Sequence, residues 1–72
     1  MRVSEAQQLK NGQKVFIDYQ GKNDKVFCQG IVEGTYSDVQ PKRNIYNVEY
    51  ILVSVKYQGI RSMFPSFCLS KI

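Results

Sequence analysis

Positively charged side chains are the residues of this sequence whose type best suits them to contact a partner molecule. Ten Lys and Arg residues against six Asp and Glu residues give a formal net charge of +4 over 72 residues. Several cations that share one surface can bind the phosphates of a nucleic acid. The candidate phosphate-binding residues, which lie in or next to expected loops or in an expected hairpin, are Lys22, Lys25, Lys42, Arg43, Lys56 and Arg61. The alternative is that they are ordinary solubilising residues, with Asp24 and Asp38 neutralising part of the patch.

Aromatic side chains are the second group that could contact a ligand. Tyr19, Tyr36 and Tyr46 lie close to the expected loops and could stack on the bases of a single strand. A different arrangement is an aromatic cage for a cationic ligand, and its components would be Tyr19, Tyr36, Tyr46 and Tyr57 with Asp18 or Glu49. Aromatic residues at strand spacing most often pack in or beside the core, which is the third interpretation of these residues.

Residues that support catalysis are scarce. The sequence has no histidine, which argues against His-based acid–base catalysis and the usual Cys/His zinc sites. Its carboxylates show neither an acid–base pair nor metal-ligand spacing. Cys28 and Cys68 could form a disulfide if their strands meet in register, whereas cytoplasmic cysteines are more often small buried hydrophobic residues. We therefore expect no enzymatic activity, cofactor, bound metal or small-molecule substrate.

The length of 72 residues is enough for one small domain, which we place at 1–72. Its hydrophobic fraction of 43% and charged fraction of 22% are typical of soluble globular chains. No apolar run approaches the ~20 residues of a membrane helix, and residues 1–12 lack the apolar core of a signal peptide. We expect a cytoplasmic protein without membrane contact.

Alternating apolar and polar residues predict five strands. The expected strands span residues 14–20, 25–36, 45–57, 60–64 and 68–72. Gly30 and Gly34 interrupt the second strand and indicate a bend or bulge. The third strand is dense in β-branched and aromatic residues. Its apolar phase reverses near Tyr50, which indicates a bulge or a passage between two sheet faces.

A two-residue turn at Gln58 and Gly59 predicts a hairpin between the third and fourth strands. The register that follows places Tyr57 opposite Ile60, Lys56 opposite Arg61, Val55 opposite Ser62, and Val53 opposite Phe64. Like charges directly across a hairpin are destabilising. Lys56 and Arg61 therefore either spread apart into solvent or bind an anion between them.

Two short helical turns complete the expected structure. The S-x-x-Q pattern that begins at Ser4 predicts a helical turn through about Leu9. Residues 65–67 (PSF) predict one turn of 3₁₀ helix before the last strand. Five short, bent strands then fit a small closed barrel, which leaves no long unpaired edges.

The expected barrel would position the loop cations. In the strand order that we expect, the first two connecting loops lie at the same rim. Lys22 and Lys25 would then sit beside Lys42 and Arg43 around a shallow groove. This arrangement would bring four cations within reach of one phosphate backbone.

Three segments carry a family resemblance. Residues 9–17 (LKNGQKVFI) resemble an L-K-x-G-x-K-V-x-V entry, residues 30–32 (GIV) a second-strand G-x-V, and residues 64–72 (FPSFCLSKI) a 3₁₀-turn-then-strand ending. These are features of small SH3-like barrels of the Tudor and KOW types. The chain has no tryptophan and no A-L-Y-D-Y strand, unlike the domains that bind proline-rich peptides. The resemblance implies a five-stranded SH3-like barrel that binds nucleic acid or a nucleic-acid-associated complex.

Two functions from different classes follow. The first is a non-catalytic, basic barrel that contacts nucleic-acid phosphates with little sequence discrimination. The alternative is a protein-interaction module, a small regulatory or inhibitory protein of the kind that phages encode, acting on a larger partner. Its surface would include Met63 and Leu52 on the outward face of the hairpin. Association of copies through open barrel edges is a third option.

Overall fold

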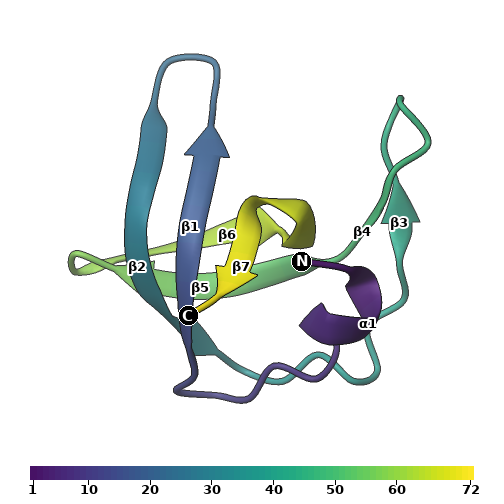
Figure 1. The fold of residues 1–72 in the computed structure, drawn as a ribbon, viewed down its shortest axis with the longest axis horizontal. Helices are drawn as coiled ribbons and strands as arrows, with labels where there is room; N and C mark the ends of the chain where they lie inside the picture. The colour runs from purple at the N-terminus through teal and green to yellow at the C-terminus, as the bar shows by residue number, and fades with distance from the viewer.

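Five strands form one antiparallel sheet, and two short strands form a separate hairpin (Figure 1). The computed structural model describes residues 1–72. In chain order the elements are α1 (Val3–Ala6), β1 (Lys14–Gln20), β2 (Lys25–Glu33), β3 (Lys42–Arg43), β4 (Glu49–Tyr50), β5 (Leu52–Tyr57), β6 (Ile60–Pro65), η1 (Ser66–Cys68) and β7 (Leu69–Lys71). The strand order in the sheet is β6-β5-β2-β1-β7, and β3 pairs with β4.

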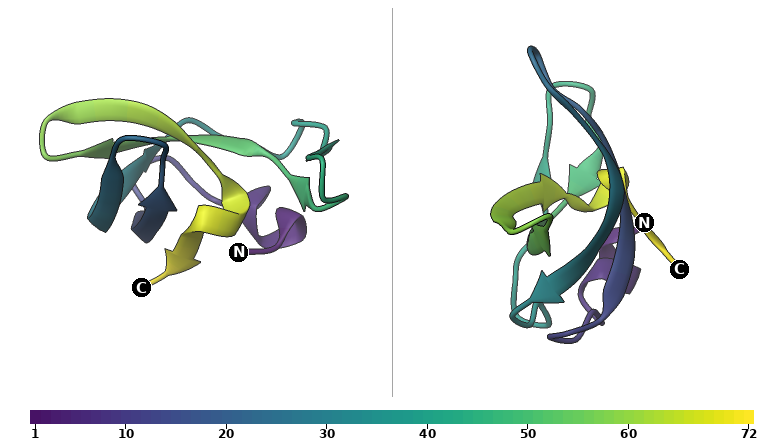
Figure 2. Two further views of the ribbon diagram at one scale, coloured as in Figure 1. Left: turned by 90° about the horizontal axis from the view of Figure 1, so that it is seen from above. Right: turned by 90° about the vertical axis from the view of Figure 1, so that its left-hand side faces the viewer.

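Two ribbons of strands cross one another and enclose the core. β1 and β2 pair along the whole length of β1, from Lys14 opposite Ile31 to Gln20 opposite Lys25. β2 pairs with β5 over only three residues, and the β5–β6 ribbon then runs across the β1–β2 ribbon (Figures 1 and 2). The buried apolar residues of the core are Ala6, Leu9, Val15, Ile17, Val26, Val32, Tyr36, Ile51, Val53, Val55, Phe64 and Leu69.

The contact between the two ribbons depends on the predicted alternation and on one glycine. Val15 and Ile17 of β1 are fully buried and Asp18 is exposed, as the sequence pattern predicts. Gly30 of β2 lies directly against β5. A Cβ atom at this position would collide with Val55 Cγ1 and lie 3.0 Å from the carbonyl oxygen of Lys56. The missing side chain therefore lets the β5 backbone pass close to β2.

The β5–β6 hairpin has the predicted turn and register. Gln58 and Gly59 form the turn, with φ angles of 49° and 77°. Positive φ at both central residues gives a turn whose twist matches that of the flanking strands. Lys56 is opposite Arg61, and the other predicted pairs are also present. The hairpin prediction is confirmed.

The third predicted strand, 45–57, is divided in two. The side-chain oxygen of Asn44 accepts the backbone N–H groups of Tyr46 and Val48 at 2.9 and 3.0 Å, and Asn47 has a φ angle of 62°. These contacts reverse the chain where the sequence predicts a continuous strand, so that β3 and β4 form a hairpin. The reversal of apolar phase falls at the break between β4 and β5.

Other element boundaries differ by a few residues. β2 ends three residues early because Gly34, with a φ angle of 89°, turns the chain. α1 is shorter than the predicted turn through Leu9, and the Glu5 carboxylate caps it by accepting the N–H of Arg2 at 3.1 Å. η1 begins one residue later than predicted and still precedes the last strand.

The sheet is open, and the predicted closed barrel does not form. β6 and β7 are its two edge strands, and η1 joins them without any pairing between them (Figure 2). The predicted all-β class, N-terminal helical turn and 3₁₀ turn are confirmed. α1 has four residues and η1 three, so neither helical turn is long enough to span a bilayer.

Candidate binding surface on the outer face of the sheet

The loop cations that were predicted to share one rim lie in two separate places. The turn between β1 and β2, which carries Lys22 beside Lys25, closes one end of that ribbon. The connection after β2 leaves from the other end, because successive connections in an antiparallel meander alternate between ends. Lys42 and Arg43 consequently lie on the opposite side of the molecule from the β1–β2 turn (Figure 1). The prediction of a shared rim is wrong.

Arg43 is engaged within its own hairpin. Its Nη2 atom lies 3.6 Å from Glu49 Oε2, and its Nη1 atom donates to the backbone and side-chain oxygens of Asn47, both at 3.1 Å. These contacts hold β3 and β4 together. Lys42, opposite Tyr50, is equally exposed but forms no ion pair.

Of the two options for Lys56 and Arg61, spreading apart or binding an anion, the structure shows an anion at Arg61 that the chain itself supplies. The guanidinium of Arg61 forms a two-point contact with the carboxylate of Glu33, in which Nη2 donates to Oε2 at 3.2 Å. Glu33 lies on β2, diagonally across from Arg61 through β5. Because the Arg61 side chain is 69% exposed, the pair contributes about 0–1 kcal/mol to stability. It also relieves the repulsion between the two cations.

Residues in register across four strands form a row of cations on the outer face. Lys14 is opposite Ile31, Ile31 is opposite Lys56, and Lys56 is opposite Arg61. Directly opposed residues project from the same face of a sheet. We call Lys14, Lys56 and Arg61 the basic row. The sequence reading missed Lys14, because its position in the row depends on the pairing of β1 with β2.

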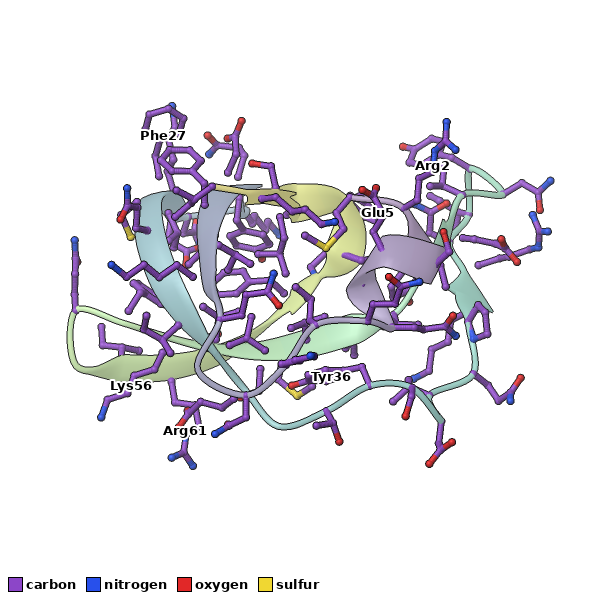
Figure 3. The ribbon with its side chains drawn as sticks, turned by 60° about the horizontal axis from the view of Figure 1, so that its bottom comes forward. Arg2, Glu5, Phe27, Tyr36, Lys56 and Arg61 are labelled. Atoms are coloured by element: carbon purple, nitrogen blue, oxygen red, sulfur yellow. The ribbon has the colours of Figure 1, made fainter.

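A pair of phenylalanines, half-buried Phe16 and exposed Phe27, lies on the same face. Phe16 and Phe27 have ring centroids 4.8 Å apart in an edge-to-face arrangement, and Phe27 is 63% exposed. The Nζ atom of Lys25 lies 5.6 Å from the centroid of the Phe27 ring. We call Phe16 and Phe27 the aromatic pair. Phe27 projects at the end of β2 away from Lys56 (Figure 3). Phe27 precedes Ile31, the β2 residue in line with the basic row, by four residues, which corresponds to roughly 13 Å along the strand.

Tyr36, predicted to lie on an exposed aromatic rim, belongs to the core. It is only 7% exposed. Its hydroxyl donates to the carbonyl oxygen of Glu33 and accepts the backbone N–H of Ser54 at 2.8 Å. The ring therefore ties the end of β2 to β5 and offers no face to a ligand (Figure 3). Sequence gives no signal for this contact, since it joins residues 18 positions apart.

The aromatic cage, one of the three interpretations of these tyrosines, does not assemble. Tyr19 and Tyr57 both pack against Phe64, with ring centroids 5.4 and 5.6 Å away. Tyr36 is in the core, and Tyr46 is at the tip of the β3–β4 hairpin. The four rings thus occupy three places, and the packing interpretation holds for all but Tyr46.

The tip of the β3–β4 hairpin is a second exposed apolar surface. Ile45 is 91% exposed, Tyr46 78% and Val48 43%. The Asn44 side chain and the ion pair of Arg43 fix the backbone that presents them. Exposed apolar groups on an ordered loop are typical of contact surfaces for another macromolecule. The sequence prediction placed these residues in a strand and so missed the tip.

The outward residues of the β5–β6 hairpin are only partly as predicted. Met63 is 54% exposed on the outer face, where it is opposite Ser54. Leu52 is half-buried and is opposite Pro65. Met63 is therefore the exposed apolar residue of this hairpin face.

The two cysteines are free and separated by a strand. Cys28 on β2 is opposite Ile17 of β1, and Leu69, the residue after Cys68, is opposite Ile17 from the other side. Two strand spacings amount to about 10 Å, beyond the ~7 Å that a disulfide can bridge. The strands of the two cysteines do not meet, so the disulfide option is wrong.

Cys68 lies at the junction of the 3₁₀ turn and the N-terminus. Burial, followed by the negative charge of Asp18, raises the pKa of the Cys68 thiol, and the N-terminal ammonium opposes this shift. The Met1 ammonium itself donates to the carbonyl oxygens of Ser66 and Leu69 at 3.1 and 2.7 Å. A raised pKa reduces the thiolate fraction and hence the nucleophilicity of this cysteine.

The candidate sites rest on the geometry of this chain alone. It matches no family model, and the comparisons with curated proteins and with solved structures give no match. The outer face, with its basic row and aromatic pair, and the tip of the β3–β4 hairpin are the two surfaces whose composition indicates binding.

Proposed function

We propose that the protein is a non-catalytic binding module that holds single-stranded nucleic acid against the outer face of its sheet. The observation that carries the proposal is the aromatic pair, which lies between Lys25 on one side and the basic row on the other. Single-strand binding combines cations that follow the backbone with aromatic rings on which bases stack. Both components are present on this one face.

The two components have separate roles. A base stacked on Phe27 contributes about 1–3 kcal/mol, with little dependence on its identity. Lys14, Lys25 and Lys56 contact phosphates, whereas Arg61 is held by Glu33. Three phosphate contacts by lysine give a slope of log affinity against log salt of about −2, at ~0.7 per contact for single strands.

The first test compares two phenylalanines. Phe27→Ala is expected to weaken binding of a fluorescent oligothymidylate about 5- to 150-fold, as the loss of one stacked base requires. Phe67→Ala is the matched control, because Phe67 is also about half exposed and packs edge-to-face, against Tyr50, away from the outer face. Equal affinities of the two variants in fluorescence anisotropy would exclude stacking on the aromatic pair.

The second test measures the salt dependence of lysine variants. Lys14→Gln and Lys56→Gln are each expected to reduce the salt slope by about 0.7. Lys42→Gln removes the same charge from the β3–β4 hairpin and should leave the slope unchanged. If Lys42→Gln is the only variant that reduces the salt slope, the phosphate contacts are made by the loop cations that the sequence predicted.

We also propose that the fold is an open relative of the SH3-like barrels. The order β6-β5-β2-β1-β7 supports this, because the last strand returns to pair with the first. The 3₁₀ turn between β6 and β7 supports it further. The sequence patterns at residues 9–17 and 64–72 fall on the start of β1 and on the η1–β7 segment, where the resemblance requires them.

The second candidate function is protein binding through the hairpin tip. Its specific support is the exposure of Ile45 and Tyr46 on a backbone fixed by hydrogen bonds. Ile45→Ser should abolish capture of a partner from native lysate, and nuclease treatment should leave the capture intact. If nuclease abolishes the capture, the interaction depends on nucleic acid. If Ile45→Ser leaves the capture unchanged, the partner binds another surface.

A further inference from the structure

β2 is paired along its whole length on one side but only briefly on the other. On the side of β1, every residue from Lys25 to Ile31 has a partner. On the side of β5, pairing begins only at Ile31, opposite Lys56, and ends at Glu33. The first six residues of β2 therefore have a free edge, although β2 lies in the middle of the sheet.

The backbone groups on this free edge can be identified from the hydrogen bonds of Val32. Its N–H donates to the carbonyl of Gln13, and its carbonyl accepts the N–H of Gly12, both at 2.8 Å and both on the β1 side. Successive residues of a strand direct their N–H and C=O groups to opposite edges. Phe27 and Gln29, like Ile31, therefore direct theirs away from β1, and β5 does not reach them.

The course of β5 explains why the edge stays open. β5 ends in the Gln58–Gly59 turn just past Lys56, and the β5–β6 ribbon crosses β2 instead of continuing beside it (Figure 2). A groove of about 420 Å³ separates the free edge from this turn. Its lining residues are Asp24, Lys25, Val26, Phe27, Cys28, Tyr57 and Gln58.

The two sides of the free edge differ in chemistry. Val26 and Cys28 face inward, and together with Tyr57 they form the apolar part of the groove, whereas Asp24 and Gln58 belong to its polar part. Lys25 and, beyond the groove, Lys56 lie on the outer face. A strand laid along this edge would alternate its side chains between an apolar and a basic environment.

We propose that the free edge of β2 binds an extended peptide of a partner protein, one that alternates apolar and acidic residues. The peptide adds as a strand whose backbone pairs with Phe27 and Gln29. Its apolar side chains enter the groove beside Val26, and its acidic side chains lie near Lys25. This site uses the backbone edge of β2 and not the ring of Phe27, but both proposals use Lys25, so a bound peptide and a bound nucleic acid would compete for that side chain.

Hydrogen exchange of the free protein tests the edge itself. The amides of Phe27 and Gln29 should exchange fast, and those of Cys28 and Gly30, which point towards β1, should be protected. Equal protection of all four amides would overturn the proposal, because the edge would then already be paired. If Phe27 and Gln29 are protected only at high protein concentration, and sedimentation then shows dimers, the edge binds a second copy of the chain. This result would also overturn the proposal.

Binding is tested with peptides selected from a random dodecapeptide display library. Gln29→Pro removes an N–H group that the sheet does not use and also fixes the φ angle at this position. Gln29→Ala is the control that loses the same side chain and keeps the N–H. Gln29→Pro should weaken a selected peptide about 2- to 12-fold beyond Gln29→Ala, as loss of one backbone hydrogen bond requires. A library that gives no binder, or binders that tolerate Gln29→Pro, would refute the proposal.

A second readout keeps the test decisive if Gln29→Pro does not fold. Addition of a selected peptide to the unmodified protein should slow exchange at Phe27 and Gln29 by more than the general slowing that stabilisation of the folded protein gives to the core amides. No such additional slowing at these two amides would overturn the proposal. Oligothymidylate should bind Gln29→Ala as tightly as it binds the unmodified protein. Loss of peptide binding with intact oligothymidylate binding would therefore count against the peptide site alone, and the reverse result would count against the nucleic-acid site alone.

Discussion

Removal of one hydroxyl group, in Tyr36→Phe, tests whether this ring is structural. The Tyr36 hydroxyl donates to the carbonyl of Glu33 and accepts the N–H of Ser54. The substitution deletes one oxygen atom and leaves the ring in the core. It therefore isolates the contribution of the bridge between β2 and β5 from the contribution of apolar packing.

The magnitude follows from the two groups left without a partner. An unpaired buried donor or acceptor costs about 1–3 kcal/mol. Ser54 is half-buried, so water can satisfy part of its N–H, and we expect about 1–2 kcal/mol in total. In a domain of this size each kcal/mol lowers the melting temperature by about 4–8 °C. The expected fall is therefore on the order of 4–16 °C.

The assays are thermal unfolding, for the melting temperature, and urea unfolding, for the free energy, both followed by far-ultraviolet circular dichroism, since the chain has no tryptophan. Tyr46→Phe is the matched control, because it deletes the same atom from a ring that is 78% exposed, and it should change stability by less than about 0.5 kcal/mol. Oligonucleotide affinity of folded Tyr36→Phe should be unchanged. A Tyr36→Phe variant as stable as Tyr46→Phe, or one that is stable but binds weakly, would refute the structural assignment.

Three further predictions concern packing, reactivity and charge. Gly30→Ala should destabilise the protein by about 1–3 kcal/mol in urea unfolding, because its Cβ would collide with β5. Cys68 in the Cys28→Ser variant should react with a maleimide more slowly than a free thiol at pH 8, because its pKa is raised. The stability that this raised pKa contributes is fully present below about pH 9, the ordinary value, and is lost as the pH rises through the higher folded-state pKa. Glu33→Gln should elute later from heparin and lose no more than about 1 kcal/mol of stability, because it removes a carboxylate from an exposed ion pair beside the basic row.

Local sequence patterns were sufficient wherever a short turn determines the pairing. The Gln58–Gly59 turn fixes which residues of β5 and β6 are opposite each other, so Lys56 and Arg61 could be paired from sequence. The alternation in β1 identifies its buried face in the same way. In both cases the relevant residues are close in the chain.

The site depended on contacts that no local pattern encodes. Lys14 joins the basic row only because β1 and β5 both pair with β2, and Glu33 reaches Arg61 only across two strand pairs. The Asn44 side chain reversed a segment whose apolar residues alone indicated a strand. The shared rim of the first two loops was wrong for a different reason. Successive connections between antiparallel strands lie at opposite ends of the strands, and this rule could have been applied to the sequence.

The brief pairing of β2 with β5 produces both candidate sites in the sheet. Three paired residues are enough to bring Lys56 into line with Ile31 and so complete the basic row. Because β5 then crosses β2, closely enough that Gly30 tolerates no side chain, the backbone of Phe27 and Gln29 is left free. A β5 that followed β2 for four more residues would cover that edge and move its turn over the groove. The crossing of the two ribbons, more than any single residue, therefore determines what this small sheet can bind.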